Sequence, residues 1–263
     1  MPASFAAVLT HWSPEPSVVL GLLLLSGGFV WLQRQPGRGV SRGRQACFFV
    51  AIGLLVLALL SPLDELSDRY LLFAHMIQHL LLVLLIAPLL VRAMPRSWGA
   101  RLWINPVLAF AAFNVVFAGS HVQVWYEATL THESLHVIEH LLYLLTGMLN
   151  WLPVLNPARE RRISEPLQML YLFAETIPMF IVGALLSLSE TAVYPFYLRA
   201  PRIIPGFSAI EDQSMAGLLM WIGGSFFYLG ALTLVFFRWA NKEIGLDQPV
   251  QEEKWIEPTR LSA

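Results

Sequence analysis

The chain has 263 residues, of which 56% are hydrophobic and only 13% charged, and its mean hydropathy is +0.60. Soluble domains carry about 25% charged residues, so this composition indicates an integral membrane protein rather than a soluble enzyme. The formal net charge is −1, with no basic tail of the kind that binds nucleic acid. The single cysteine, Cys47, excludes an intramolecular disulfide.

Seven segments are long and apolar enough to span a bilayer, which requires about 20 mostly apolar residues. They predict an all-α bundle of seven transmembrane helices within a single domain, 1–263, at about 16–33, 45–61, 70–91, 103–120, 134–152, 166–188 and 213–238. Polar residues interrupt the fourth and fifth spans at Asn114, Glu139, His140 and Asn150. The aromatic loop 189–212 is expected to lie along the membrane interface.

The distribution of basic residues predicts the orientation of these spans. The loops after the first, third and fifth spans and the C-terminal tail together carry Arg34, Arg38, Arg42, Arg44, Arg92, Arg96, Arg101, Arg159, Arg161, Arg162, Arg238, Lys242, Lys254 and Arg260. The opposite side carries only Arg69, Arg199 and Arg202. Because cytoplasmic loops hold the excess of Lys and Arg, we expect the N-terminus outside and the C-terminus in the cytoplasm, as a multi-pass protein of a bacterial plasma membrane.

On this topology all seven histidines lie outside the membrane or in its outer half, and none lies near the cytoplasm: His11, His75, His79, His121, His132, His136 and His140. Residues four apart share a helix face, so the third span presents a pair of imidazoles and the fifth span a ladder of three. The segment HMIQHLL at 75–81 matches HVIEHLL at 136–142 in the pattern H-x-I-[QE]-H-L-L. Ionisable residues inside a membrane usually mark a site. We therefore expect His75, His79, His136 and His140 to converge between the third and fifth spans.

Imidazoles at this spacing suit a copper, zinc, iron or nickel ion. One pair at i, i+4 cannot supply both axial ligands of a haem, and two haems about one helical turn (~6 Å) apart would collide, so only a single haem remains as an alternative. The thioether of Met76, near the face of His79, favours Cu(I). The other span methionines, Met148, Met169, Met179 and Met220, are interpreted as packing residues.

Further polar residues are candidates for supporting roles. Additional ligands or hydrogen-bond partners of the metal site are expected among His121, His132, Asp212, Gln78 and Glu139. For Asp212, at the outer start of the seventh span, a helix cap is an equally good interpretation. Glu175, near the middle of the sixth span, is a candidate for an ion or proton path.

The stretch THESLHVIEHLL at 131–142 also contains H-E-x-x-H, from His132 to His136, a signature of zinc peptidases. Glu133 would act as the general base in such an enzyme, but it is predicted at the membrane surface, where a glutamate needs no catalytic role. The second histidine motif in the third span is also left unexplained. An intramembrane zinc metallopeptidase therefore remains an alternative, as does a haem-binding membrane electron carrier.

Three runs resemble the CtaG-type family, which is associated with assembly of caa3-type cytochrome c oxidase: HMIQHLLLVLLIAPLL at 75–90, LHVIEHLLYLLTGMLNWLP at 135–153 and EDQSMAGLLMWIGG at 211–224. The resemblance covers nearly the whole chain. It implies a non-enzymatic role in maturing a haem–copper oxidase, with copper, as Cu(I) or Cu(II), handled for its active site. Zinc and haem are less favoured ligands. The resemblance carries over to His75, Gln78, His79, His136, His140, Asp212 and Gln213. The expected partners are an oxidase subunit or a copper chaperone within the bilayer, and the oligomeric state is left open.

Overall fold

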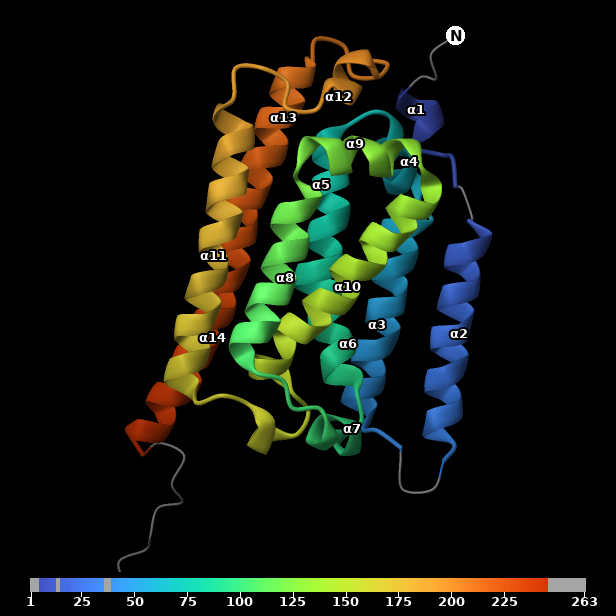
Figure 1. The fold of residues 1–263 in the computed structure, drawn as a ribbon. Coiled ribbons are helices and arrows are strands. Elements are labelled where there is room, and N and C mark those ends of the chain that lie inside the picture. Colours follow the sequence, from blue (N-terminus) through green and yellow to red (C-terminus); the bar gives the residue numbers. More distant parts are fainter. Residues whose placement is uncertain (1–4, 13–14, 36–38, 246–263) are drawn as a thin grey trace, which may run out of the picture.

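The structure is a computed structural model that describes residues 5–12, 15–35 and 39–245 as a bundle of helices (Figure 1). Arg38, Lys254 and Arg260, three of the basic residues used for orientation, lie outside these ranges. Six helices are long and apolar enough to cross a membrane: α2 (Pro16–Gln33), α3 (Arg42–Leu59), α5–η1–α6 (Leu72–Ala93), α10 (Glu133–Leu155), α11 (Glu165–Leu188) and α13–η3–α14 (Ala209–Glu243). No strand occurs in the described ranges, so the predicted all-α membrane bundle is confirmed.

The fourth predicted span ends where expected, near residue 120, but a second helix that was not predicted follows it after a sharp bend. α8 (Pro106–Ser120) has 15 residues and is about 22 Å long, shorter than a bilayer's hydrocarbon core. α9 (Gln123–Thr131) follows at an angle of 74° and lies across one end of the bundle (Figure 1). The pair brings the number of candidate spans to seven, and the break places His121 where the two helices meet.

Short helices gather at the two ends of the bundle. α1 (Phe5–Val8), α4 (Pro62–Arg69), α9 and α12 (Pro195–Arg199) lie at one end, which we call the α4–α9 end and which is the outer end on the predicted topology (Figure 1). α7 (Arg96–Arg101) lies at the other end, and η2 (Arg159–Arg161) follows α10. The loop 189–212, expected along the interface, buries two of its aromatic rings. Tyr194 stacks on Tyr126, and Tyr197 donates a hydrogen bond to the Ser67 carbonyl at 3.1 Å.

Two spans contain π-helical turns, η1 (Leu81–Ile86) and η3 (Leu219–Gly224). Such turns are uncommon and are frequent at functional sites. η1 starts two residues after His79, and the backbone carbonyl of Val83 within it accepts a hydrogen bond from the Trp151 indole at 2.9 Å. This bond joins the third span, one turn beyond His79, to α10 well beyond His140, and it helps to hold the relative register of the two helices.

Gln78 connects three helices near the α4–α9 end. Its amide nitrogen donates to the Ala58 carbonyl at 2.9 Å and to the Asp64 carboxylate at 2.7 Å, while its carbonyl oxygen accepts from Ser67 at 2.9 Å. These bonds tie α3 and α4 to α5. Burial raises the pKa of the Asp64 carboxyl to about 7, and the neighbouring Asp68 carboxylate adds to this increase.

Replacing Asp64 with asparagine is expected to increase the stability of the protein, compared with wild type at the same pH, as the pH rises. The folded-state pKa of about 7 lies above the ordinary value of 3.8, so Asp64 contributes most to stability at low pH, and this contribution is lost as the pH rises through 7. An asparagine at this position would keep the bond from Gln78 without titrating. Thermal unfolding in detergent, followed from about pH 5 to about pH 8, should show the unfolding temperature of the variant rising relative to that of wild type. A constant difference would contradict this account.

Candidate metal centre

α5 and α10 bring four imidazole rings together near the α4–α9 end. His75 and His79 lie on α5, His136 and His140 on α10, and within each pair the rings are one helical turn apart, with centroids 4.3 and 4.2 Å apart. Across the two helices, the centroids of His75 and His136 are 5.6 Å apart, and those of His79 and His140 are 5.4 Å apart. The repeated H-x-I-[QE]-H pattern therefore places its four histidines in one cluster, hereafter the histidine cluster.

The size of this cluster matches a single ion. Metal–nitrogen bonds of about 2.0–2.1 Å in a tetrahedral site place imidazole centroids roughly 5 Å apart. Five of the six centroid separations lie between 4.2 and 6.4 Å, on both sides of this value, with the longest of the five between His75 and His140. Among the described residues no compact group of ligand atoms includes His140, so its ring would have to move closer for all four imidazoles to bind one ion.

The cluster contains an unusual number of buried nitrogen atoms without a hydrogen bond. Among the described residues, neither ring nitrogen of His75 or His79 has a partner of good geometry, and neither does Nε2 of His136 or His140. Well over nine in ten buried polar groups in native proteins are satisfied, and each exception costs about 1–3 kcal/mol. Six such atoms within one cluster are a donor set that fits a metal ion.

Two carboxylates border the cluster. His136 Nδ1 lies 3.2 Å from the Asp68 carboxylate, which leaves Nε2 free toward the other rings. Metal-binding histidines commonly make this contact, because a carboxylate on one nitrogen fixes the ring's tautomer and orientation. Glu139 is fully buried, receives a hydrogen bond from the Trp125 indole at 3.2 Å, and has an oxygen 3.8 Å from His79 Nε2.

Each carboxylate forms a compact triad with the rings. The ligand atoms of Asp68, His75 and His136 lie within 4.8 Å of one another, and so do those of His75, His79 and Glu139. His75 belongs to both triads and is fully buried. Glu139 was expected as an additional ligand or a hydrogen-bond partner of the histidines, and in the structure it lies against His79 and His75.

Asp68 is a site residue that sequence reasoning missed. It lies in α4, a segment that the sequence analysis treated as a loop, and the chain turns after Arg69 so that α4 packs against α5. Burial opposes ionisation of the Asp68 carboxyl, but the hydrogen bond and charge of His136 outweigh it and lower the pKa of Asp68 below its ordinary value. The available signal was the acidic run Asp64, Glu65 and Asp68 shortly before His75.

Other sequence candidates lie outside the cluster. His132 is exposed at the start of α10, with Nδ1 3.1 Å from the Ala128 carbonyl. His11 contacts Glu65 at 2.6 Å. Gln78 makes its hydrogen bonds to α3 and α4, as described above. Asp212 caps α5 through the backbone amides of Leu72 and Phe73, at 2.9 and 3.0 Å.

Glu175 belongs to a separate polar group deeper in the bundle. Its carboxylate accepts a hydrogen bond from Asn114 at 3.2 Å, and its second oxygen is buried without a partner in the described part of the chain. Tyr171, one turn earlier on α11, donates to the Asn150 carbonyl at 3.1 Å. Asn150 lies ten residues beyond His140 on α10, about 15 Å along the helix axis, so this group does not share the ion position of the histidine cluster.

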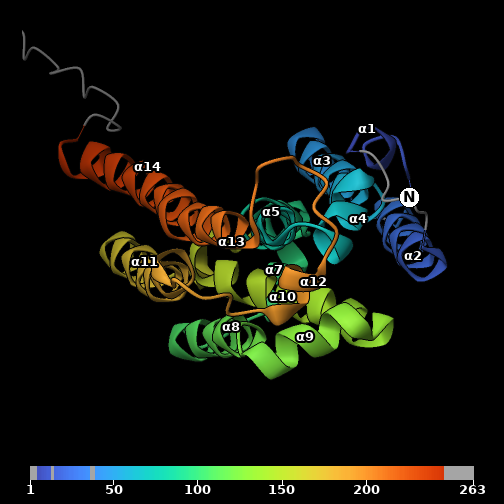
Figure 2. The ribbon, with the colours of Figure 1, turned by 90° about the horizontal axis from the view of Figure 1, so that it is seen from above.

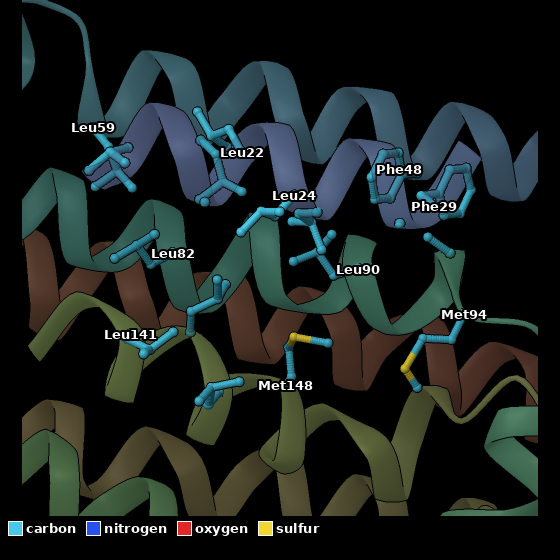
Figure 3. A pocket seen from close by; sticks show the side chains of 18 of the residues that line it. Leu22, Leu24, Phe29, Phe48, Leu59, Leu82, Leu90, Met94, Leu141 and Met148 are labelled. Atoms are coloured by element: carbon cyan, nitrogen blue, oxygen red, sulfur yellow. The ribbon is translucent and has the colours of Figure 1, made fainter. Parts of the chain in front are cut away.

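A large apolar cavity of about 770 Å³ separates α2 from the rest of the bundle (Figure 3). α2, α3, α6 and α10 supply its walls, including Leu22, Phe29, Phe48, Leu90, Leu141 and Met148. His140 also borders it, and is the one member of the histidine cluster that does so in the described structure. Because aliphatic walls offer no ligands to a hydrated ion, the polar α4–α9 end is the better entrance to the cluster.

The fold and the site together define a multi-pass α-helical membrane protein with a histidine and carboxylate cluster near one end of the bundle. The chain belongs to the family described as cytochrome c oxidase caa3 assembly factor, whose profile matches residues 25–242. The match includes all four cluster histidines, Asp68 and Glu139. No curated protein and no solved structure matches the chain.

Proposed function

We propose that the protein binds one copper ion in the histidine cluster and thereby assists copper-site maturation of a caa3-type oxidase. The observation that supports this most strongly is the set of six buried, unpartnered ring nitrogens on two facing helices. Imidazole is a good ligand for copper in either oxidation state, and the family resemblance described above implies that copper is handled for the oxidase. His75, His79, His136 and His140 would hold the ion.

The neighbouring carboxylates have different tasks in this proposal. Asp68 accepts from His136 Nδ1 and so aims Nε2 at the ion, while Glu139 balances part of the ion's positive charge inside the membrane. A cation in a low-dielectric interior needs such compensation. Copper would then leave for an oxidase subunit, or arrive from a copper chaperone, at the outer face of a bacterial plasma membrane. The family role favours a carrier over an enzyme.

The peptidase alternative is less favoured by the geometry. A zinc peptidase would use His132 and His136 together, but His132 is exposed and its Nδ1 contacts the carbonyl of the preceding helix. Glu133, the base in that scheme, is also exposed. The ladder of three histidines on α10 thus contributes its two inner members to the cluster.

Replacing both His136 and His140 with alanine is expected to weaken Cu(II) binding by the purified chain at least about 100-fold, because half of the imidazole ligands are removed. Competition with a chromophoric copper chelator measures the affinity. His132→Ala is the matched control, since it removes the third imidazole of the same ladder from an exposed position and should leave affinity unchanged. Unaltered copper affinity in the double variant would refute the site assignment.

The same variants test the cellular role. In cells that rely on a caa3-type oxidase, the double variant should lower the copper content of the isolated oxidase, whereas the His132→Ala strain should match wild type. If the isolated oxidase has a normal copper content in a strain whose variant no longer binds copper, metal binding by this protein is not what the assembly role requires.

A further inference from the structure

A second, much smaller cavity lies directly beside the histidine cluster. Its volume is about 10 Å³, close to the minimum needed for one water molecule or ion. It is lined by residues of α5, η1, α8, α10, α11 and η3, and by His121 directly after α8. Figure 2 shows α5, α8, α10 and α11 in the same part of the bundle when it is seen from above. Its lining consists of Met76, His79, Leu80, Val83, Phe117, His121, Tyr143, Met179 and Met220.

Three methionines from three different spans meet at this cavity. Met76, Met179 and Met220 are each only 1% exposed, and they come from α5, α11 and η3. A Cβ at Gly224 would collide with the Met179 sulfur, so the glycine makes room for that sulfur. Single methionines in a core are usually packing residues, and the sequence analysis interpreted Met179 and Met220 in that way. Three thioethers around one small cavity, together with two imidazoles, are a different arrangement.

His121 is oriented as a ligand of this cavity. Its Nδ1 lies 2.6 Å from the Phe117 carbonyl, so Nδ1 carries the proton and Nε2 is the acceptor. Nε2 is buried and has no hydrogen-bond partner within the described ranges. A histidine held through one nitrogen by a carbonyl, with the other nitrogen free, is the usual state of a metal ligand before binding.

His79 forms the wall between this cavity and the histidine cluster. It lines the cavity, its ring centroid is 5.4 Å from that of His140, and both of its ring nitrogens are unpartnered in the described structure. Its Nε2 is the nitrogen that faces Glu139, at 3.8 Å. The cavity and the histidine cluster are thus adjacent, with His79 between them.

We propose that this cavity is a binding site for a soft monovalent ion, Cu(I), coordinated by the thioethers of Met76, Met179 and Met220 and by Nε2 of His121. Thioether and imidazole ligands select Cu(I) over harder ions. No carboxylate lines the cavity in the described structure, and burying a single positive charge among neutral ligands costs far less than burying a divalent ion. The proposal rests on copper as the protein's cargo, but it concerns a different set of ligands from the histidine cluster.

The test uses silver(I) as a redox-inert probe for Cu(I), and zinc(II) as a probe for the histidine cluster. In the full-length protein, replacing Met179 and Met220 together with leucine should weaken silver binding at the cavity at least about 100-fold and leave zinc affinity unchanged. Leucine conserves volume, so the fold should persist, and thermal unfolding checks this. Met169→Leu, on α11 but away from the cavity, is the matched control and should bind both ions normally.

A second measurement does not depend on any variant. Wild-type protein labelled with selenomethionine and loaded with one equivalent of Cu(I) should show selenium in the first coordination shell by copper X-ray absorption. Only nitrogen and oxygen neighbours, or unchanged silver affinity in the double methionine variant, would overturn the proposal, as would a wild-type protein that takes up neither ion.

The outcomes for the two regions are distinguishable. If the variant with His136→Ala and His140→Ala loses zinc but keeps the selenium shell around Cu(I), both regions bind metal as proposed. If that variant keeps its zinc and copper affinity, the histidine cluster is not the site, while the selenium result still decides whether the methionine cavity is one.

Discussion

Replacing Gly217 with alanine is expected to destabilise the protein by at least about 3 kcal/mol, although alanine is a better helix former than glycine. A Cβ at Gly217 would lie 2.5 Å from both the Gly183 carbonyl oxygen and the Ser187 amide nitrogen. Both contacts are with backbone, which cannot rotate away, so α11 and α13 would have to separate. The contact is reciprocal, because a Cβ at Gly183 would lie 2.7 Å from the Gly217 carbonyl oxygen. Small residues allow membrane helices this close an approach.

Gly230→Ala provides the matched control on the same long span. Gly230 is exposed in α14, and an added Cβ would meet nothing within 4 Å. There the substitution should stabilise the helix by about 1 kcal/mol through propensity alone. Thermal unfolding in detergent should therefore shift in opposite directions for the two alanine variants. A shift of the same sign and size in both would contradict the close packing of α11 on α13.

The consequences of Gly217→Ala should extend to the two proposed metal-binding regions. α13 carries Asp212 and leads directly into η3, which carries Met220. Moving this helix outward would draw Met220 away from Met179 and Asp212 away from α5. We therefore expect silver(I) affinity and stability to fall together in this variant, whereas zinc binding should fall less, since the cluster histidines lie on α5 and α10.

Much of the fold follows from local sequence patterns. Hydropathy predicts the long spans because each must match the bilayer thickness, and the four-residue spacing of histidines places two rings on one face of each helix. The matched motifs further indicate which two faces meet. Each of these inferences depends on residues within one helix, or on two segments whose sequences resemble each other.

The residues that were missed depend on contacts between dissimilar segments. Asp68 contacts His136 only because the chain turns after α4. The local sequence does not predict how this short acidic helix packs against the long ones. Met179 and Met220 look like ordinary core residues until α11 and η3 are placed against α5. The helix α9 was likewise not predicted, although the end of the fourth span at His121 was.

Replacing Asp212 with alanine is expected to destabilise the protein by roughly 2–6 kcal/mol, because two buried backbone amides would lose their acceptor. The carboxylate is fully buried and accepts from Leu72 and Phe73, in the first turn of α5. These amides have no partner within their own helix, and a carboxylate there also interacts favourably with the helix dipole. Asp212 is thus a cap supplied by one span to another, rather than to its own helix.

A graded series separates this capping role from the metal-ligand role that the sequence also allowed. Asp212→Asn keeps one acceptor oxygen, so its loss of stability should lie between that of wild type and that of Asp212→Ala. Glu211→Ala, which removes the adjacent carboxylate of a local capping box, should cost only about 1 kcal/mol. If Asp212 were a ligand, the asparagine variant would lose metal while its thermal unfolding stayed like that of wild type. If Asp212 is a cap, the asparagine variant should instead lose stability. Its copper affinity should fall only as far as the first turn of α5 loosens, because His75 follows Phe73 by two residues.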